Sequence, residues 1–229
     1  PAALGFFGGK RFVPIVTSLA AISISLIMVY VWPVVYGALV DFGIAISDMG
    51  AVGAGIYGFF NRLLIPVGLH HALNQVFLFD LVGINDISKF WSSTGELGVT
   101  GIYQGGFFPV MGYGLPAACL AMYHCALPEN KKKIGGILGA SALTAILTGV
   151  TEPIEFAFMF VAPVLYVIHA FLAAISLYIA ASMQWIAGFT FSGGLIDFVL
   201  SYNLPLAMKP YMLIVQGLCF SAIYYSVFR

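Results

Sequence analysis

The chain of 229 residues is 61% hydrophobic and only 8% charged. A soluble domain carries about 25% charged residues, so water is not the main solvent of this chain. Nine Lys and Arg residues balance nine Asp and Glu residues, which excludes the basic surface that a nucleic-acid-binding protein needs. No polar linker divides the sequence, and we predict a single membrane domain over residues 1–229.

The first predicted membrane span covers residues 12–40, an apolar run longer than the roughly 20 residues that a bilayer requires. Trp32 and Tyr36 within it are placed like interfacial anchors. Residues 41–61 are rich in glycine, and we predict an amphipathic or closely packed helix there.

Residues 62–79 are apolar but are interrupted by Pro66 and Gly68, and they carry Arg62 and two histidines. A helix that faced lipid would not tolerate these charged and polar groups. Irregular backbone at membrane depth is stable only where it lines a cavity or is covered by protein. The pattern therefore predicts a re-entrant hairpin that lines a cavity.

Residues 80–101 are the most polar stretch and are predicted to form an aqueous loop. A second apolar segment, 105–127, ends just before Lys131, Lys132 and Lys133. Basic residues favour the cytoplasmic ends of membrane spans. We therefore expect these lysines to share the cytoplasmic side with Lys10 and Arg11, and residues 80–96 to lie nearer the other side.

The remaining segments alternate between apolar runs and short polar breaks. We predict an apolar arm at 134–149, a full-length span at 156–181, a glycine-rich segment at 184–200 and a final span at 211–228. The three cysteines lie in or beside apolar segments without the spacing of a metal site, and we expect neither a metal nor a cofactor.

Glu152 and Glu155 lie between the arm and the following span. An ionised group at membrane depth costs about 2.5–3.5 kcal/mol, so its presence indicates a role. Pro153 disfavours a helix at Glu152 and predicts a helix break that faces a polar cavity. Glu155 suits the first turn of the next helix, where it complements the helix dipole. The alternative is an interfacial loop in which both carboxylates face water.

Arg62 and His70 are eight residues apart, and we expect both to reach the cavity that Glu152 lines. His71 is assigned to packing, and His124 and His169 to the membrane interface.

No phosphate-binding loop, nucleophile elbow or zinc motif is present, so no catalytic residue is assigned. The hydrogen-bonding groups available, which include Asn74 and Gln104 among many aromatic residues, suit a neutral polyhydroxylated ligand such as a sugar.

Five motifs resemble the membrane-spanning IIC component of phosphotransferase-system permeases of the glucose superfamily. They occur in the order of that family over most of the chain: NRLLIPVGLHH (61–71), GLPAA (114–118), PENKK (128–132), TGVTEPIEF (148–156) and FSGG (191–194). Three further motifs look most like N-acetylglucosamine permeases, with glucose permeases second: FFGGKRFVP (6–14), HALN (71–74) and YNLP (202–205).

The resemblance implies an all-α, multi-pass protein of the bacterial plasma (inner) membrane, with transmembrane helices and re-entrant hairpins around the sugar. It implies a homodimer and a cytoplasmic phosphodonor, the IIB domain or protein. This chain resembles the later part of a IIC domain, and we expect N-terminal spans to precede Pro1. The phosphorylated Cys and His domains are not recognisable in it, so the phosphoryl group would come from another domain or protein.

Residues Arg62, His70, Thr151 and Glu152 match the sugar-contacting positions of the family, and Asn74 is added to them as a substrate-binding residue. Glu152 would accept hydrogen bonds from sugar hydroxyls while Arg62 and His70 orient the ring. An elevator-like or rocking motion would then present the C6 hydroxyl to the phosphodonor.

Two other classes of function remain open from the residues alone. In an ion-coupled secondary transporter, Glu152 or His70 would carry the coupling proton. An intramembrane hydrolase is less favoured, because carboxylates at i and i+3 on one segment do not readily flank a bond from opposite sides.

Overall fold

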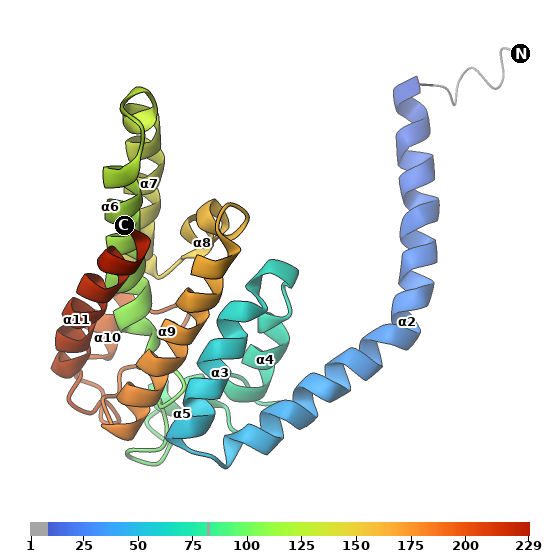
Figure 1. The fold of residues 1–229 in the computed structure, drawn as a ribbon. Coiled ribbons are helices and arrows are strands. Elements are labelled where there is room, and N and C mark those ends of the chain that lie inside the picture. The colour runs from blue at the N-terminus through green and yellow to red at the C-terminus, as the bar shows by residue number, and fades with distance from the viewer. Residues whose placement is uncertain (1–8, 82) are drawn as a thin grey trace, which may run out of the picture. The chain divides into compact units, whose positions relative to one another are not determined.

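The computed structural model describes residues 9–81 and 83–229, and the first residues of the motif at 6–14 lie outside this range. The chain divides after Asp41 into two compact units, which are described separately (Figure 1). The N-terminal unit contains most of α2 (Phe12–Ser47), a 36-residue helix that follows a short 3₁₀ turn (Gly9–Arg11).

Helix α2 contains the predicted span at 12–40 and continues beyond it. It is long and apolar enough to cross a membrane. Its side chains at positions 12–34 are exposed, and nearly all of them are apolar or small. An exposed face of this composition is stable in lipid or against other membrane helices, not in water.

The second unit, Phe42–Arg229, consists of helices joined by turns and irregular segments, and within the described residues its only β pairing is the isolated bridge between Ile186 and Met208. Two of its helices, α9 and α11, are also long and apolar enough to span a membrane. The expected all-α polytopic membrane fold is confirmed. The helices after α2 are α3 (Ala51–Leu63), α4 (His70–Phe77), α5 (Asp86–Trp91), the π-helix η3 (Pro109–Gly114), α6 (Leu115–Cys125), α7 (Pro128–Thr148), α8 (Glu152–Met159), α9 (Pro163–Ser182), α10 (Leu195–Ser201) and α11 (Tyr211–Phe228).

The structure has a hairpin of α3 and α4, which begins before the predicted segment 62–79, since all but the last two residues of α3 precede Arg62. A 3₁₀ turn (Ile65–Val67) joins the two helices and ends at Gly68, whose φ of 73° favours glycine. Helix α3 packs along α9 at its small residues, since a Cβ on Gly55 or Gly58 would lie only 3.1–3.3 Å from atoms of α9. The closely packed helix predicted at 41–61 is confirmed for residues 51–61 only, because α2 extends to Ser47 and a turn at 48–50 separates it from α3.

The predicted single span at 156–181 is wrong. Helix α8 ends at Met159, and α9 begins at Pro163 after a short irregular connection. Proline lacks a backbone donor and disfavours helix at the residue before it, so it begins a helix more readily than it continues one. Pro116 differs, because α6 continues from the π-helix η3 without a break and Pro116 therefore lies inside a continuous helical stretch.

The polar segment after α4 is held by the buried carboxylate of Asp86. Its Oδ1 accepts a 2.7 Å hydrogen bond from the Gly101 backbone and its Oδ2 a 2.8 Å bond from Gln104 Nε2. Gln104 Oε1 in turn accepts from the backbone N–H of Phe189 at 2.9 Å. Gln104 is fully buried, so it links two loops and is not the ligand-binding group that the sequence suggested.

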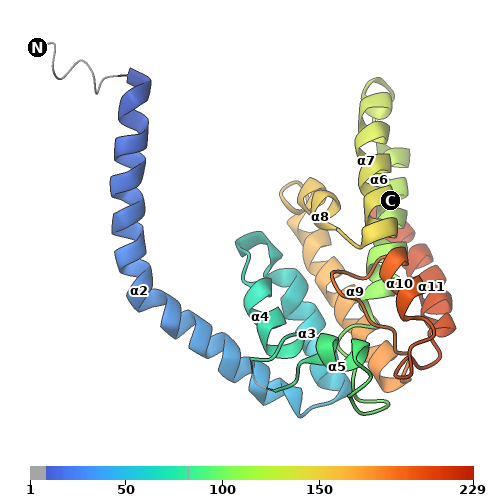
Figure 2. The ribbon, with the colours of Figure 1, turned by 180° about the vertical axis from the view of Figure 1, so that it is seen from behind.

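Helix α5 and the α6–α7 turn lie at opposite ends of the second unit, and the view from behind agrees (Figures 1 and 2). The α6–α7 turn carries Lys131 to Lys133, so the separation of this basic cluster from the polar segment around α5 agrees with the expected topology. Lys10 belongs to the other unit. That Lys10 and these lysines lie on the same side of the membrane therefore stays a prediction.

Asp86→Asn should alter how stability depends on pH. Burial raises the pKa of Asp86 from 3.8 to about 6, although the hydrogen bonds from Gly101 and Gln104 act in the opposite direction. The folded protein thus binds this proton more tightly than the unfolded chain, and the resulting stability is complete below pH 3.8 and is lost as the pH rises toward about 6. Thermal melting of both proteins across this range should show this decline only in the wild type. Parallel curves would contradict the assignment.

Gly106→Ala should destabilise the protein, because a Cβ there would lie 2.3 Å from the Cα of Leu177 and 2.8 Å from the carbonyl oxygen of Ser176. Overpacking against backbone costs about 1–3 kcal/mol or more. Gly139→Ala is the matched control, since it lies inside α7 with nothing within 4 Å and should stabilise the helix by up to about 1 kcal/mol. Melting temperatures that moved in the same direction would refute the close contact.

Candidate functional site

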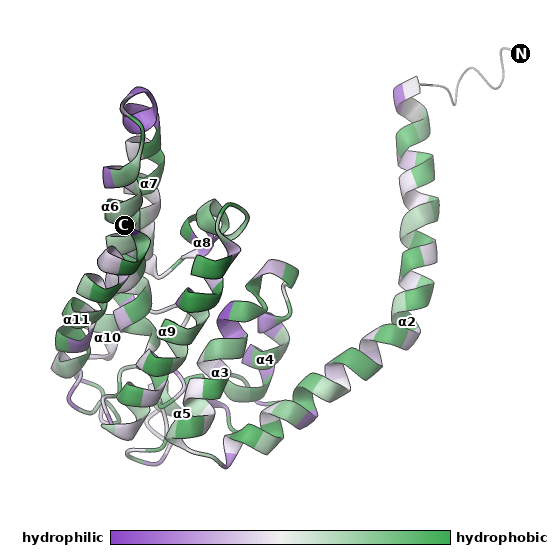
Figure 3. Cartoon of the chain, viewed as in Figure 1, coloured by the Kyte–Doolittle hydropathy of each residue, from purple (hydrophilic) through white to green (hydrophobic). Residues whose placement is uncertain are grey.

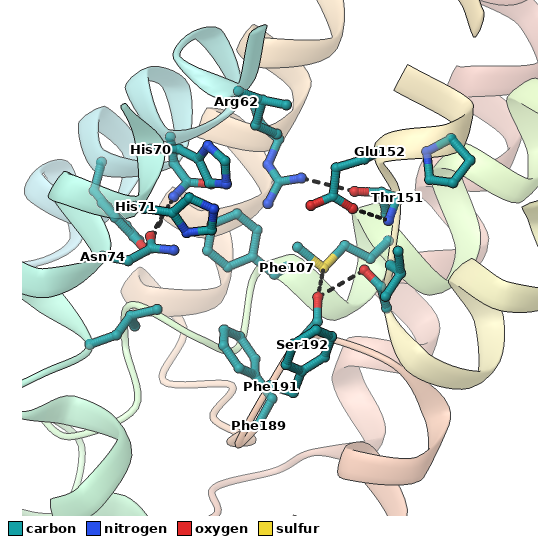
Figure 4. A pocket seen from close by; sticks show the side chains of 18 of the residues that line it. Arg62, His70, His71, Asn74, Phe107, Thr151, Glu152, Phe189, Phe191 and Ser192 are labelled. Atoms are coloured by element: carbon teal, nitrogen blue, oxygen red, sulfur yellow. Dashed lines mark hydrogen bonds between the residues drawn. The ribbon is translucent and has the colours of Figure 1, made fainter. Parts of the chain in front are cut away.

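A cavity of about 520 Å³ lies between the α3–α4 hairpin, the segment 149–153 at the junction of α7 and α8, and the irregular segment 189–192 (Figure 4). This volume is within the range of small-molecule sites. The cavity combines one wall of charged and amide side chains with another of aromatic rings. Arg62, His70, Asn74, Thr151 and Glu152, the five residues predicted from sequence, all line it.

Arg62 lies in the last turn of α3 and is only 5% exposed. Its Nη1 donates to Glu155 Oε1 at 2.9 Å and to Thr151 Oγ1 at 3.2 Å. Its guanidinium carbon lies 4.8 Å from the centre of the Phe107 ring, within the range of a cation–π contact. Nε is buried and has no hydrogen-bond partner in the protein.

Glu155 is fully buried, and a single oxygen, Oε1, accepts from three groups. Besides Arg62, the donors are the Thr151 hydroxyl at 3.0 Å and His169 Nε2 at 3.1 Å. Since an ionised carboxylate only accepts, His169 carries its proton on Nε2, and in the neutral ring Nδ1 accepts from the Tyr224 hydroxyl at 2.7 Å. Glu155 thus has the structural role that the sequence gave it, through an ion pair as well as a helix end.

His169 does not lie at the membrane interface as predicted, because it is fully buried within α9. Nothing in the local sequence distinguishes it, since its partners Glu155 and Tyr224 are 14 and 55 residues away. His124 fits the interfacial prediction better: it is exposed near the end of α6 and bonds the Tyr225 hydroxyl at 2.8 Å.

Glu152 begins α8 at the predicted break between helices. Helix α7 ends at Gly149 with φ 76°, and Pro153 occupies the first turn of α8. The Glu152 carboxylate is half-buried and points into the cavity toward Arg62 (Figure 4). Oε2 accepts a 3.1 Å bond from the Thr151 backbone N–H. Glu152 and His70 therefore share one cavity, as the sequence predicted.

His70 and His71 begin α4, and their rings lie 4.0 Å apart. His70 Nδ1 is buried without a hydrogen-bond partner in the protein. The assignment of His71 to packing is wrong, since its side chain is exposed and lines the cavity. The cavity extends around the first turn of α4, so both histidines reach it.

Asn74 lies one turn further along α4. Its amide oxygen accepts from the Tyr57 hydroxyl and from Asn61 Nδ2, each at 2.7 Å. These two donors fix the orientation of the amide, and its NH₂ group is left as a donor that a ligand in the cavity could use.

The aromatic wall consists of Phe107, Phe189 and Phe191 (Figure 4). Sequence reasoning noted the motif that contains Phe191 and Ser192 but gave it no role. Ser192 donates to the carbonyl oxygen of Gly149 at 2.8 Å, so it ties the aromatic segment to the helix break. Across residues 9–81 and 83–229, no three His, Cys, Asp or Glu side chains are grouped as a metal site would need.

Glu155→Gln removes the charge that neutralises Arg62 and nearly keeps the shape of the side chain. We expect the free energy of unfolding to fall by about 3–5 kcal/mol, because a buried guanidinium is left unpaired. The double variant Arg62→Met/Glu155→Gln should regain part of this loss. Denaturation of the purified single and double variants measures the coupling, and strictly additive losses would show that the two groups do not act as a pair.

Comparison with known proteins assigns the chain to a family. Residues 1–174 match the family model described as "Phosphotransferase system, EIIC". The chain is 47% identical, over its whole length, to the N-acetylglucosamine-specific EIICB component of Bacillus subtilis (strain 168), of which it covers 50%. It is 48% identical to the N-acetylglucosamine-specific EIICBA component of Escherichia coli (strain K12), of which it covers 36%.

A glucose-specific EIICBA component of Staphylococcus saprophyticus is 42% identical over the whole chain, which covers 36% of that protein. The chain therefore spans half or less of the length of these relatives. The match to the family model covers well over half of the chain, and the helices of the structure are those of an integral membrane protein. The chain belongs to the EIIC family of the phosphotransferase system.

Proposed function

We propose that this chain forms the sugar-binding part of a phosphoenolpyruvate-dependent phosphotransferase permease, and that its sugar is N-acetylglucosamine. The observation that carries the proposal is the convergence of the Glu152 carboxylate, the Arg62 and Asn74 donors and an aromatic wall on one cavity. The relatives named for N-acetylglucosamine support this sugar, and the relative named for glucose makes glucose the second candidate.

The chemistry of the cavity suits a neutral sugar. Sugar hydroxyl groups donate hydrogen bonds to carboxylates and accept them from guanidinium and amide groups. One wall of the cavity carries a carboxylate acceptor as well as guanidinium and amide donors. Because Glu155 already neutralises Arg62, the net charge of the cavity comes from Glu152, which is free to accept from the ligand. The rings of Phe107 and Phe189 offer an apolar surface to the C–H face of a sugar ring.

The chain would hold the sugar and move it toward a cytoplasmic phosphodonor of the IIB type. There the bond between phosphorus and the donor's cysteine sulfur breaks, a bond between phosphorus and the C6 oxygen forms, and the hydroxyl proton is released. Phosphoryl transfer depends mainly on positioning and charge stabilisation. The contribution of this chain would be the position of the sugar, while another domain or protein supplies the phosphoryl group.

The proposal includes the setting of the chain within a larger protein. We propose that it is the later part of a IIC domain in the lipid bilayer, preceded by further spans, and that the complete protein forms a homodimer. The chain covers 50% and 36% of two relatives, which supports only its place within a larger protein.

The rival function is ion-coupled sugar transport with Glu152 or His70 as the proton carrier. Membrane vesicles that contain the whole permease distinguish the two. Under the proposed function, N-acetylglucosamine is released inside as its phosphate and only when the phosphodonor is supplied. Accumulation of unmodified sugar under an ion gradient alone would favour the rival.

Glu152→Gln should weaken binding of N-acetylglucosamine and leave the fold intact. A hydrogen bond to a charged group contributes about 1.5–3 kcal/mol against about 1 kcal/mol for a neutral one, so the affinity should fall roughly 2- to 30-fold. Calorimetry on the purified protein measures this change, with glucose as the competing ligand. Glu129→Gln, an exposed carboxylate at the start of α7, is the control and should bind like wild type.

Glu155→Gln completes the comparison, since it should lower thermal stability more, and sugar affinity less, than Glu152→Gln does. Unchanged binding in Glu152→Gln together with lost binding in a folded Glu155→Gln protein would reverse the two roles.

A further inference from the structure

A second cavity lies at the end of the unit that carries the α6–α7 turn. It is an apolar groove of about 400 Å³ lined by α6, α7, α8 and α11. Its lining includes Cys125, Ile134, Ile137, Leu138, Ala157 and Phe228, and it shares no lining residue with the sugar cavity. Ile137 is 58% exposed, so this wall of the groove is open at the surface.

A cluster of positive charge lies directly beside this groove. Residues 129–133 contain three lysines and one glutamate, a net charge of +2, in the first turn of α7. Figure 3 shows the hydrophilic residues gathered at the α6–α7 turn, with apolar residues below them along both helices.

The helical repeat decides which lysines face the groove. Lys131 precedes Ile134 by three residues and Leu138 by seven, and Lys133 precedes Ile137 by four. Such spacings place each lysine on the same side of α7 as its own groove residues. Lys131 and Lys133 are two residues apart in the sequence, so they flank the groove-lining face of α7 from its two sides. Lys132 has no groove residue at these spacings and lies on the opposite side of α7.

The position of Lys131 is also set by α6. Its Nζ lies 5.1 Å from the centre of the Tyr123 ring. The same ring packs so closely on α7 that a Cβ on Gly135 would lie 2.8 Å from it. The half-buried cation is therefore held between α6 and α7, two of the helices that line the groove.

We propose that this groove binds an anionic phospholipid, with an acyl chain along Ile134, Ile137 and Leu138 and the phosphodiester between Lys131 and Lys133. The apolar groove and its cationic mouth match the two parts of such a lipid. In a bilayer, basic residues at the ends of spans attract anionic headgroups by about 1 kcal/mol each. The proposal depends on membrane insertion and not on the sugar site.

The test is native mass spectrometry of the purified full chain titrated with phosphatidylglycerol and, separately, with phosphatidylcholine. We expect retention of phosphatidylglycerol well above that of phosphatidylcholine. Lys131→Gln and Lys133→Gln should each weaken it about fivefold, the factor that corresponds to about 1 kcal/mol. Lys132→Gln makes the same change of charge in the same turn and should have little effect.

A second pair of variants tests the groove. Ile137→Ser should weaken retention of phosphatidylglycerol, whereas Leu143→Ser, which is 57% exposed on another side of α7, should not. Inorganic phosphate at the concentration of the lipid should fail to displace it, because phosphate makes no contact with the groove.

Four results would overturn the proposal. Equal retention of the two lipids would mean that the negative charge of the headgroup is not recognised. Equal effects of Lys131→Gln and Lys132→Gln would mean that the lysines attract lipid only through their total charge and not through their positions beside the groove. Displacement by inorganic phosphate would identify a phosphate site instead. No effect of Ile137→Ser in a folded protein would mean that the groove holds something other than an acyl chain, such as another segment of the full-length protein.

Discussion

The ion pair between Arg62 and Glu155 is the interaction on which the second unit depends. Both groups are almost completely removed from solvent, and their nitrogen and oxygen lie 2.9 Å apart. A buried charge is tolerated only when it is paired and hydrogen-bonded. The end of α3 must therefore lie against the start of α8, and His169 extends the same contact to α9 and, through Tyr224, to α11. A single carboxylate oxygen thus fixes how four helices meet.

This pairing also explains how two glutamates three residues apart differ in role. Glu155 is enclosed by donors from its own protein, whereas Glu152 accepts only from the neighbouring backbone and faces the cavity. The Arg62 guanidinium, held by Glu155, forms part of the wall that Glu152 faces. The site therefore gains a fixed cation without using the carboxylate that is directed at the ligand, which is the preorganisation that selective binding requires.

The parts of this structure that were predictable from sequence are those that the chain determines locally. Pro66 and Gly68 predict the hairpin, and Pro153 predicts the break, because these residues restrict or permit backbone conformations wherever they occur. Arg62, His70 and Glu152 followed from the same breaks, whereas Thr151 came from the resemblance to the family and Asn74 from the hydrogen-bonding groups available. The connection before Pro163 was missed because hydrophobicity continued through it. The roles of His169 and Gln104 depend on partners distant in sequence, which hydrophobic patterns do not reveal.

The contact between the segments 149–153 and 189–194 has a mechanical consequence. Ser192 bonds the Gly149 carbonyl, and a Cβ on Gly149 would lie 2.7 Å from the backbone nitrogen of Gly193. The two backbones touch where neither has a side chain, so there is no soft layer between them that could shear. Any displacement of the helix break must carry the aromatic segment with it. A transport movement would therefore treat these two loops as one rigid part, and the sliding surfaces must lie elsewhere.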